Sequence, residues 1–327
     1  LMSLAKVKKL VEEIIGIVAV TRDMCPNQCH AYLGPLALLE NCMQCNKPCY
    51  DSEELTLTGK KVSLMEFDTY LLGPQLQVSQ RSPKTTFAMC YLATKVQSVK
   101  EALEVLEDKT GADFIYNDYA CEEAFLDFVE KHKLTEDDHI LMISTNSFQL
   151  YKNKKSDTYI GIWVLKDLRQ DQRVWKVNLM PAFNVPSPNK VKNLDLFLLL
   201  SLQHVSALQK KNGGHGYKEW DAAKQEVVYS RLGVVYKTAN HISLVEMDGH
   251  VGHYGAIGCH SNCPMWGRHK LNSGHYFLAH YHTINAIPGC MHPDFDFNNI
   301  QAPSQEHYLE CLNTVIMSMT QTQYVAN

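Results

Sequence analysis

The sequence lacks any long hydrophobic run. In the middle of its 327 residues the longest such run, LDLFLLLSL at 194–202, is interrupted by Asp195 and is far short of the roughly 20 residues that a membrane span needs. Lysine and glutamate side chains likewise interrupt residues 1–20, where the spacing of apolar residues predicts an amphipathic helix and not a secretory signal. We therefore expect neither a membrane span nor a signal peptide.

Low-complexity segments, internal repeats and an excess of positive charge are absent as well. Hydrophobic residues make up 45% and charged residues 20% of the sequence, which is typical of a soluble globular protein. The formal net charge of −4 gives no support to nucleic-acid binding, because dedicated DNA-binding domains are usually basic overall. Lysine clusters at 152–155 and 190–192 could form local basic surfaces, but a solvated face is the better explanation of each cluster alone.

Eleven cysteines are present, and four of them fall into two close pairs. The first pair is in CPNQC at 25–29 and the second is in CMQC at 42–45, with twelve residues between them. Close pairs suit tetrahedral zinc because each pair places two thiolates on one tight turn, and the loop lets the two turns face each other. The sequence thus predicts a structural Zn²⁺ site, with Cys49 and His30 as competing ligands. The predicted ligands are Cys25, Cys29, Cys42 and Cys45.

A second cluster of cysteine and histidine lies nearer the C-terminus. CHSNC at 259–263 is followed by a series of histidines, more than a protein core needs. Any one of these histidines, taken singly, also fits a surface or core position. Together, Cys259, Cys263 and His275 make a three-ligand metal set whose fourth ligand is unassigned.

Apolar segments rich in β-branched and aromatic residues predict a sheet. Residues 138–146, 158–168 and 173–180 read as three strands, and the last two form an antiparallel pair joined by the turn RQDQ. Residues 193–210 have helical periodicity, and 227–239 form a further strand. The order strand, strand, strand, helix, strand is that of an RNase H-like core, an α/β fold with a mixed sheet.

This pattern divides the chain into three expected parts. Residues 1–60 would contain an N-terminal helix and the Cys-rich zinc-binding segment. Residues 61–135 would be a helical connecting region, with helices around 99–106 and 121–132. Residues 136–327 would hold the RNase H-like core together with the second cluster of cysteine and histidine.

A series of motifs, in a fixed order along most of the chain from about residue 20 onward, carries a family resemblance. The motifs are CPNQC and CMQC, ISTNSFQLYKNKKSDTYIGIWVLKDL (143–168), PSPNKVKNLDLF (186–197), HVSALQKK (204–211), DGHVGHYGAIGCHSNCPMWGRHK (248–270), GHYF (274–277), and EHYLECLN and QTQY (306–324). They resemble the transposases of CACTA (En/Spm-type) DNA elements. Several long segments in the right order are more specific than any single motif.

The resemblance implies a DDE/D-type DNA strand transferase of the nucleus, acting on transposon ends. Such enzymes hold two divalent metal ions, Mg²⁺ in this family, about 3.5–4 Å apart between carboxylates. In the family pattern, aspartates occupy the positions of Asn146 and Asn240, and a Cys/Cys/His set matches Cys259, Cys263 and His275. We expect the third acid, usually glutamate, to follow the QTQY-like segment, beyond these 327 residues.

Asparagine at both positions predicts that metal-dependent strand transfer is lost. An amide oxygen brings no negative charge, and hard cations strongly prefer carboxylates. Asp138 cannot substitute, because eight residues of strand separate it from Asn146 by about 26 Å, and neither Asp157 nor Asp248 is placed convincingly. We therefore expect a degenerate, inactive transposase copy that does not bind Mg²⁺.

Two alternatives remain open at this point. The first is a zinc-dependent module that binds DNA or protein and regulates transposition, through self-association or through a full-length transposase. The second is an active metal-dependent transposase or nuclease whose acidic residues lie elsewhere.

Overall fold

The computed structural model describes most of the N-terminal three quarters of the chain and short pieces of the rest. The chain divides into two compact units, Leu1–Ala239 and Asn240–Asn327. In the second unit, described by itself, β9 (Arg268–His269) pairs antiparallel with β10 (Tyr276–Phe277). The described residues are 3–107, 115–149, 157–186, 189–239, 243–244, 247, 268–269, 276–277, 306, 309–310 and 313–314.

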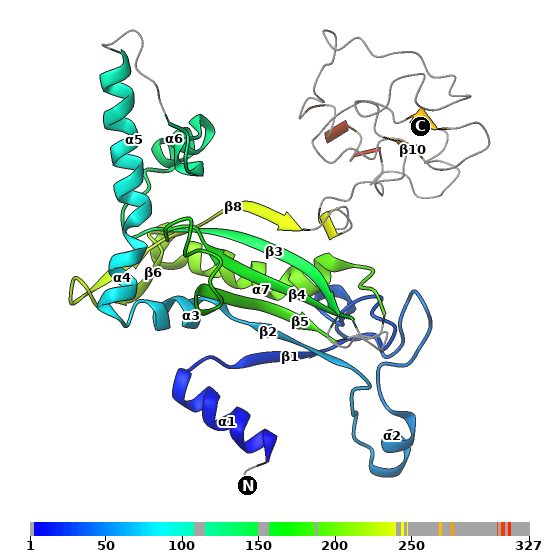
Figure 1. Cartoon of the computed structure of the whole chain (residues 1–327). Helices are drawn as coiled ribbons and strands as arrows, with labels where there is room; N and C mark the ends of the chain where they lie inside the picture. The colour runs from blue at the N-terminus through cyan, green and yellow to red at the C-terminus, as the bar shows by residue number, and fades with distance from the viewer. Residues whose placement is uncertain are drawn as a thin grey trace. The chain divides into compact units, whose positions relative to one another are not determined.

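A six-stranded mixed sheet forms the centre of the first unit, with the strand order β1-β2-β5-β4-β3-β8 (Figure 1). All neighbouring strands are antiparallel except β3 and β8, which are parallel. A parallel pair needs a crossover connection, and the long helix α7 (Leu194–Gln209) lies in it. The strands are β1 (Ala19–Asp23), β2 (Glu66–Tyr70), β3 (His139–Gln149), β4 (Asp157–Leu165), β5 (Leu179–Val185) and β8 (Leu232–Ala239).

Strand β3 buries alternate side chains, as a strand does when one face of its sheet is covered. Leu141, Ile143 and Thr145 are buried, whereas Ser144 is half-buried and Asn146 is exposed. The polar residues at the end of β3 therefore alternate between the core and the open face of the sheet.

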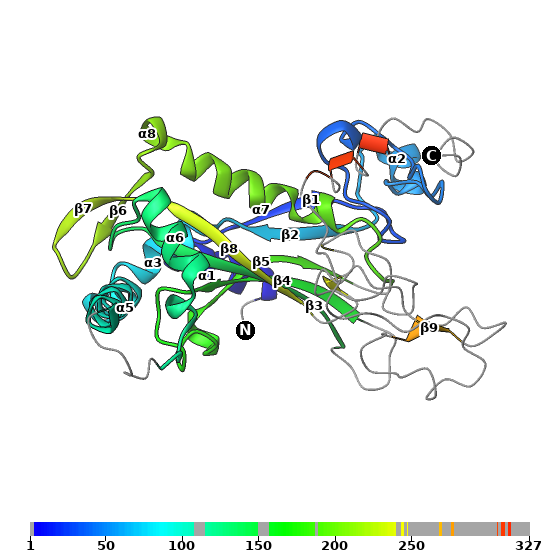
Figure 2. The ribbon, with the colours of Figure 1, turned by 90° about the horizontal axis from the view of Figure 1, so that it is seen from above.

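Helix α7 runs along one face of this sheet (Figure 2). Its fully buried Phe197 meets the ring of Phe67 from β2 edge to face, with 5.0 Å between the centroids. The buried hydroxyl of Ser201 donates a hydrogen bond of 3.2 Å to the carbonyl oxygen of Ala182 in β5. Apolar packing and one satisfied polar group thus fix the crossover helix against the strands it connects.

Gly161 of β4 leaves room for a core aromatic ring. A Cβ atom at this position would lie 2.1 Å from Cε1 of Phe183, so a side chain cannot be added without moving that ring. We expect Gly161→Ala to destabilise the protein by about 1–3 kcal/mol through overpacking, measured by urea unfolding. Ser144→Ala, on a half-buried position of β3, is the control and should change stability little. Equal stability of the two variants would contradict this packing.

The remaining helices include the three that the sequence predicts. The amphipathic helix expected within residues 1–20 is α1, capped by the Ser3 hydroxyl and ended by Gly16 in the left-handed conformation. The two central helices appear as α5 and α6. The bounds are α1 (Leu4–Ile15), α2 (Ser52–Thr58), α3 (Leu72–Ser79), α4 (Pro83–Met89), α5 (Tyr91–Glu107), α6 (Glu123–His132) and α8 (Lys211–Gly214), with 3-10 turns at Gly34–Leu36, Tyr119–Cys121 and Lys176–Asn178. None of the helices in the described residues is both long and apolar enough to span a membrane.

The strand predicted at 173–180 begins only at Leu179. The preceding residues turn instead, because the buried Arg173 donates hydrogen bonds to the carbonyl oxygen of Leu168 and to the carboxylate of Asp118. A guanidinium held in this way stabilises a turn and prevents ladder pairing. The meander itself is confirmed, since β4 and β5 are antiparallel neighbours.

The strand predicted at 227–239 is two strands. β7 (Glu226–Ser230) pairs with β6 (Tyr217–Asp221) in a separate hairpin, and β8 begins at Leu232. Arg231 lies at the break, where its guanidinium binds the carboxylate of Asp138 at 2.6 Å. The chain changes sheets at this ion pair.

Candidate functional site

The first cysteine pair lies on a tight turn held by backbone hydrogen bonds. The backbone N–H of Cys25 donates to the carbonyl oxygen of His30 at 3.0 Å, and that of Asn27 donates to Sγ of Cys25 at 3.3 Å. An antiparallel bridge between Met24 and Ala31 closes the turn.

The second pair repeats this arrangement. The backbone N–H of Cys42 donates to the carbonyl oxygen of Lys47 at 2.8 Å, and that of Gln44 donates to Sγ of Cys42 at 3.4 Å. A bridge between Asn41 and Pro48 closes the second turn. Each turn therefore directs its first sulfur towards backbone donors, although the two pairs differ by one residue in spacing.

Within the part of the chain that the structure describes, the two turns bring together the four predicted ligands and no further candidate. Their Sγ atoms all lie within 4.8 Å of one another, and those of Cys25 and Cys45 are 3.5 Å apart. Tetrahedral zinc, with Zn–S bonds of about 2.3 Å, places its sulfurs about 3.8 Å apart, so the cluster is compatible with a zinc site. Of the two competing ligands, Cys49 packs in the same apolar cluster but outside the quartet, and Nδ1 of His30 faces the carbonyl oxygen of Ala31. The members of this four-cysteine cluster are Cys25, Cys29, Cys42 and Cys45.

Three of the thiols in the cluster have shifted pKa values. Burial raises the pKa of Cys25 to about 12 and also raises that of Cys29. Burial acts in the same direction on Cys45, but hydrogen bonds from the backbone of Lys47 and from neighbouring thiols outweigh it and lower the pKa to about 6. Cys45 therefore carries its negative charge more readily than the buried thiols of Cys25 and Cys29.

The four-cysteine cluster is attached to the sheet. Gln28, buried in the first turn, donates its side-chain amide to the carbonyl oxygen of Pro186, directly after β5. The backbone carbonyl oxygen of Gln28 accepts a 3.1 Å hydrogen bond from the backbone N–H of Lys192, just before α7. The backbone N–H of Tyr32 donates to Asp23, the last residue of β1. The cluster thus braces the ends of β1 and β5.

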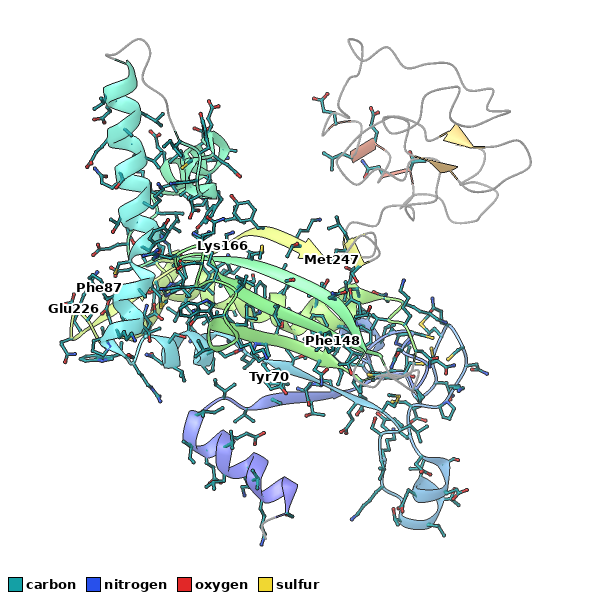
Figure 3. All side chains as sticks on the ribbon, in the orientation of Figure 1. Tyr70, Phe87, Phe148, Lys166, Glu226 and Met247 are labelled. Carbon is teal, nitrogen blue, oxygen red and sulfur yellow. The ribbon has the colours of Figure 1, made fainter. Side chains whose placement is uncertain are left out.

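The cluster is attached at the same end of the sheet as Asn146. Val185, the last residue of β5, is opposite Tyr159 of β4, which in turn is opposite Ser147 of β3. Phe148, the next residue along β3, is 58% exposed and marks this end in Figure 3.

Asn146 lies on β3 beside the last residues of β8. Its neighbour Thr145 pairs with Ala239, the final residue of β8, and Asn146 itself is opposite Ile160 on the other side. Asn240 follows Ala239 directly but is outside the described residues. The predicted pairing of residues 138–168 with each other and of β8 with the first strand is confirmed up to Ala239.

The described strand residues that surround Asn146 include no carboxylate. Residues 142–148 of β3, 158–162 of β4 and 232–239 of β8 contain no aspartate or glutamate. Along the row of paired residues that crosses from Asn146 to Ile160 and Asn184, the next acid is Asp68 of β2. Three strand spacings of about 4.8 Å put it about 14 Å away, too far to share a metal ion with Asn146.

The other acids considered from the sequence are held elsewhere. Asp138 precedes β3 at its opposite end and is bound to Arg231, whose contacts lower the pKa of this carboxyl although burial acts to raise it. Asp157 pairs with Gln149, three residues or about 10 Å along the strand from Asn146. Asp248 is outside the described residues.

A buried charged network, missed by the sequence reasoning, lies at the start of β3. His139 places Nδ1 2.8 Å from the carboxylate of Asp167 and Nε2 2.6 Å from that of Glu219, and all three side chains are at most 3% exposed. Burial alone would lower the pKa of His139, but the two carboxylates raise it well above its usual range. The only signal in the sequence is a histidine at the edge of an apolar run.

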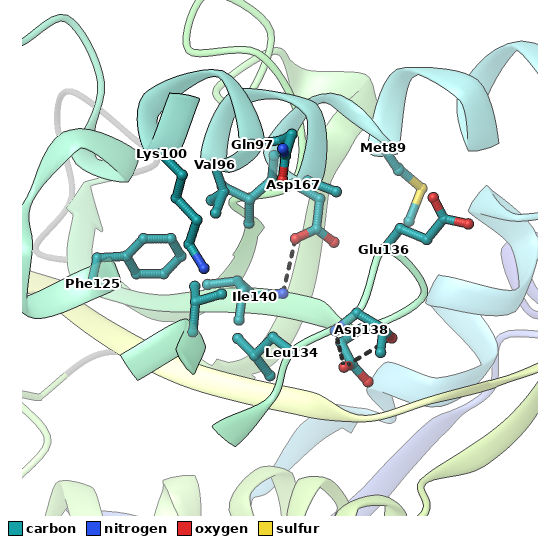
Figure 4. A pocket seen from close by; sticks show the side chains of 14 residues that line it. Met89, Val96, Gln97, Lys100, Phe125, Leu134, Glu136, Asp138, Ile140 and Asp167 are labelled. Carbon is teal, nitrogen blue, oxygen red and sulfur yellow. Dashed lines mark hydrogen bonds between the residues drawn. The ribbon is translucent and has the colours of Figure 1, made fainter. Parts of the chain in front are cut away.

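This network joins the β6–β7 hairpin to the sheet. Glu219 belongs to β6, and it also accepts hydrogen bonds from the hydroxyls of Tyr217 and Ser230. The second oxygen of Asp167 accepts from the backbone of Ile140 at 2.9 Å, beside an adjacent cavity of about 190 Å³ (Figure 4). Both oxygens of Asp167 are therefore already engaged, and the network is structural.

The second predicted metal set, Cys259, Cys263 and His275, is outside the described residues. Comparison with models of known protein families and with curated proteins found no match.

Proposed function

We propose that this chain is a catalytically inactive protein of CACTA-transposase type, with an RNase H-like core and a structural zinc module. The strand arrangement supports the proposal. Three antiparallel strands, β3, β4 and β5, are followed by α7 and then by β8, which lies parallel to β3 on its other side. This is the order strand, strand, strand, helix, strand that the sequence predicts for an RNase H-like core.

The observation that carries the proposal is an asparagine where this chemistry needs an acid. Asn146 stands exposed on the strand next to the end of β8, the place where a DDE/D enzyme would hold its two metal ions between carboxylates. Neutral amide oxygens offer no charge to offset the loss of hydration of Mg²⁺. An otherwise intact sheet without the acids fits a protein that has lost strand transfer.

The four-cysteine cluster supports a binding role, which does not require catalysis. Its four sulfurs would hold Zn²⁺, which would cross-link the two turns. The cluster braces the same end of the sheet as Asn146. Its hydrogen bonds would therefore hold this end in one conformation, ready to bind a partner. The function that we propose for it is binding to transposon-end DNA in the nucleus, or to a full-length transposase.

Binding to DNA is tested by fluorescence anisotropy at several salt concentrations. We expect affinity for element-end DNA to fall as salt rises, because phosphate contacts release counterions. Removing zinc with a chelator should abolish this binding, whereas adding Mg²⁺ should leave it unchanged. Zinc-independent affinity would contradict the proposed role of the four-cysteine cluster.

Restoring the two acids tests the assignment of the site itself. We expect Asn146→Asp with Asn240→Asp to create a stabilisation by Mg²⁺ of about 1.4 kcal/mol when Mg²⁺ is tenfold above its dissociation constant. Thermal unfolding with and without Mg²⁺ measures it. Ser147→Asp, which adds one exposed acid at the adjacent position, is the control and should give no such effect. An equal response from the control would refute the site.

A further inference from the structure

Helix α1 carries an apolar stripe that stays exposed in the described part of the chain. Val7 is 42%, Val11 is 47% and Ile14 is 70% exposed, and Leu10 beside them is 45% exposed. Val7, Val11 and Ile14 fall on one stripe because positions i, i+4 and i+7 share a helix face. A helix of 12 residues has only marginal stability in water without tertiary packing. We therefore expect another apolar surface to pack against this stripe.

Opposite charges follow one edge of the same stripe. Lys6 and Glu13 are exposed and seven residues apart, so they lie on nearly one line along the helix, about 10.5 Å from each other. Both are on the side of Leu10. The edge of the stripe is thus positive near the start of α1 and negative near its end.

We propose that α1 is a dimerisation helix that packs antiparallel against α1 of a second copy of this chain. A twofold axis midway between Lys6 and Glu13 sets each lysine opposite the glutamate of the other copy and lets the two stripes interdigitate. Symmetry forms the ion pair twice. A parallel twofold pair would instead place the charged edges of the two copies on opposite sides of the contact, where Lys6 and Glu13 gain no partner from each other. The charge pattern therefore selects a second copy and its direction.

The size of the contact predicts its strength. One helix face buries less area than a standard stable interface, so the dimer should be reversible, with a dissociation constant on the order of micromolar. This inference is independent of the proposed function, since it concerns neither the four-cysteine cluster nor Asn146.

Sedimentation equilibrium on the full chain tests the dimer. We expect Val11→Asp, which puts a charge in the centre of the stripe, to make the chain monomeric. Lys9→Glu is the matched control, because Lys9 is exposed on the opposite side of α1, and it should leave the association unchanged. A chain that is monomeric at concentrations well above the micromolar range would overturn the proposal and assign the stripe to another partner.

A charge-reversal cycle tests the antiparallel direction. Lys6→Glu and Glu13→Lys should each weaken the dimer about tenfold, since each turns two attractive pairs into repulsive ones. Combined in one chain, the two substitutions exchange the charges and should restore the affinity of the unmodified protein to within about twofold. Additive weakening in the double variant would refute the antiparallel arrangement.

Discussion

Protein purified without chelators should contain zinc in the four-cysteine cluster, and Cys42→Ser should remove one equivalent. Only four thiolates complete a closed tetrahedral site, so the loss of one ligand opens it. Because metal binding is coupled to folding, we expect a stability loss on the order of several kcal/mol. Elemental analysis measures the zinc, and faster tryptic cleavage after Lys60 and Lys61 reports the loosened segment.

Cys49→Ser is the matched control for this experiment. Cys49 is buried in the same apolar cluster, but its sulfur is outside the quartet, so its replacement should leave the zinc content unchanged. A second equivalent bound through Cys259, Cys263 and His275 would not affect the comparison, since Cys42→Ser removes one equivalent in either case. Finding no zinc in the unmodified protein, or losing it in Cys49→Ser, would refute the four-cysteine site.

Replacing His139 by alanine should destabilise the protein by about 3–5 kcal/mol, because two buried carboxylates lose the cation between them. Urea unfolding measures this loss. Lys224→Ala breaks the ion pairs to Glu136 and Asp137, both 2.6 Å long but partly exposed. This control should cost about 1 kcal/mol or less, since solvent screens such pairs. Similar losses of stability in the two variants would show that His139 does not carry a stabilising buried charge.

The His139 network also predicts how stability depends on pH. The folded-state pKa of His139 is raised, so its contribution is complete below the unfolded-state value of about 6.5 and is lost as the pH rises through the folded-state value. The advantage of the unmodified protein over His139→Ala should therefore shrink between pH 6 and pH 9, by at most about 1.4 kcal/mol per pH unit. An advantage that grows over this range would contradict a protonated His139.

The sequence predicted the features that depend on local spacing. Two close cysteine pairs were enough to identify the four ligands, because such pairs restrict the sulfurs to two turns. The long apolar run of β3 and the helical periodicity of α7 likewise identified the central strand and the crossover. These patterns arise within single segments, so a single sequence is sufficient to read them.

Features that depend on distant partners were missed. The strands β1, AVTRD, and β2, EFDTY, are short and contain charged residues. They become strands only because β2 pairs with β5 and β1 pairs with β2 at the edge of the sheet. The break at Arg231 depends on Asp138, 93 residues earlier. Similarly, His139 finds Glu219 across 80 residues of sequence. No local pattern contains such long-range ion pairs.

The site at Asn146 is predicted in part. The sequence suggested that this residue lies beside the end of the fourth core strand, and the pairing of Thr145 with Ala239 agrees up to the last described residue. The absence of acids from the neighbouring positions of β3, β4 and β8 could be seen only once the register was known. The register turns Asn146 into a testable statement about the charge at this end of the sheet.

The most direct test of the central claim is a cleavage assay with the unmodified protein. Purified, zinc-loaded protein is incubated with element-end DNA, with and without millimolar Mg²⁺ or Mn²⁺, and the products are resolved on a denaturing gel. Since Asn146 offers no charge and no carboxylate stands at the described neighbouring positions, we expect no metal-dependent cleavage. Robust Mg²⁺-dependent cleavage would contradict the inactive assignment and identify the chain as an active transposase or nuclease.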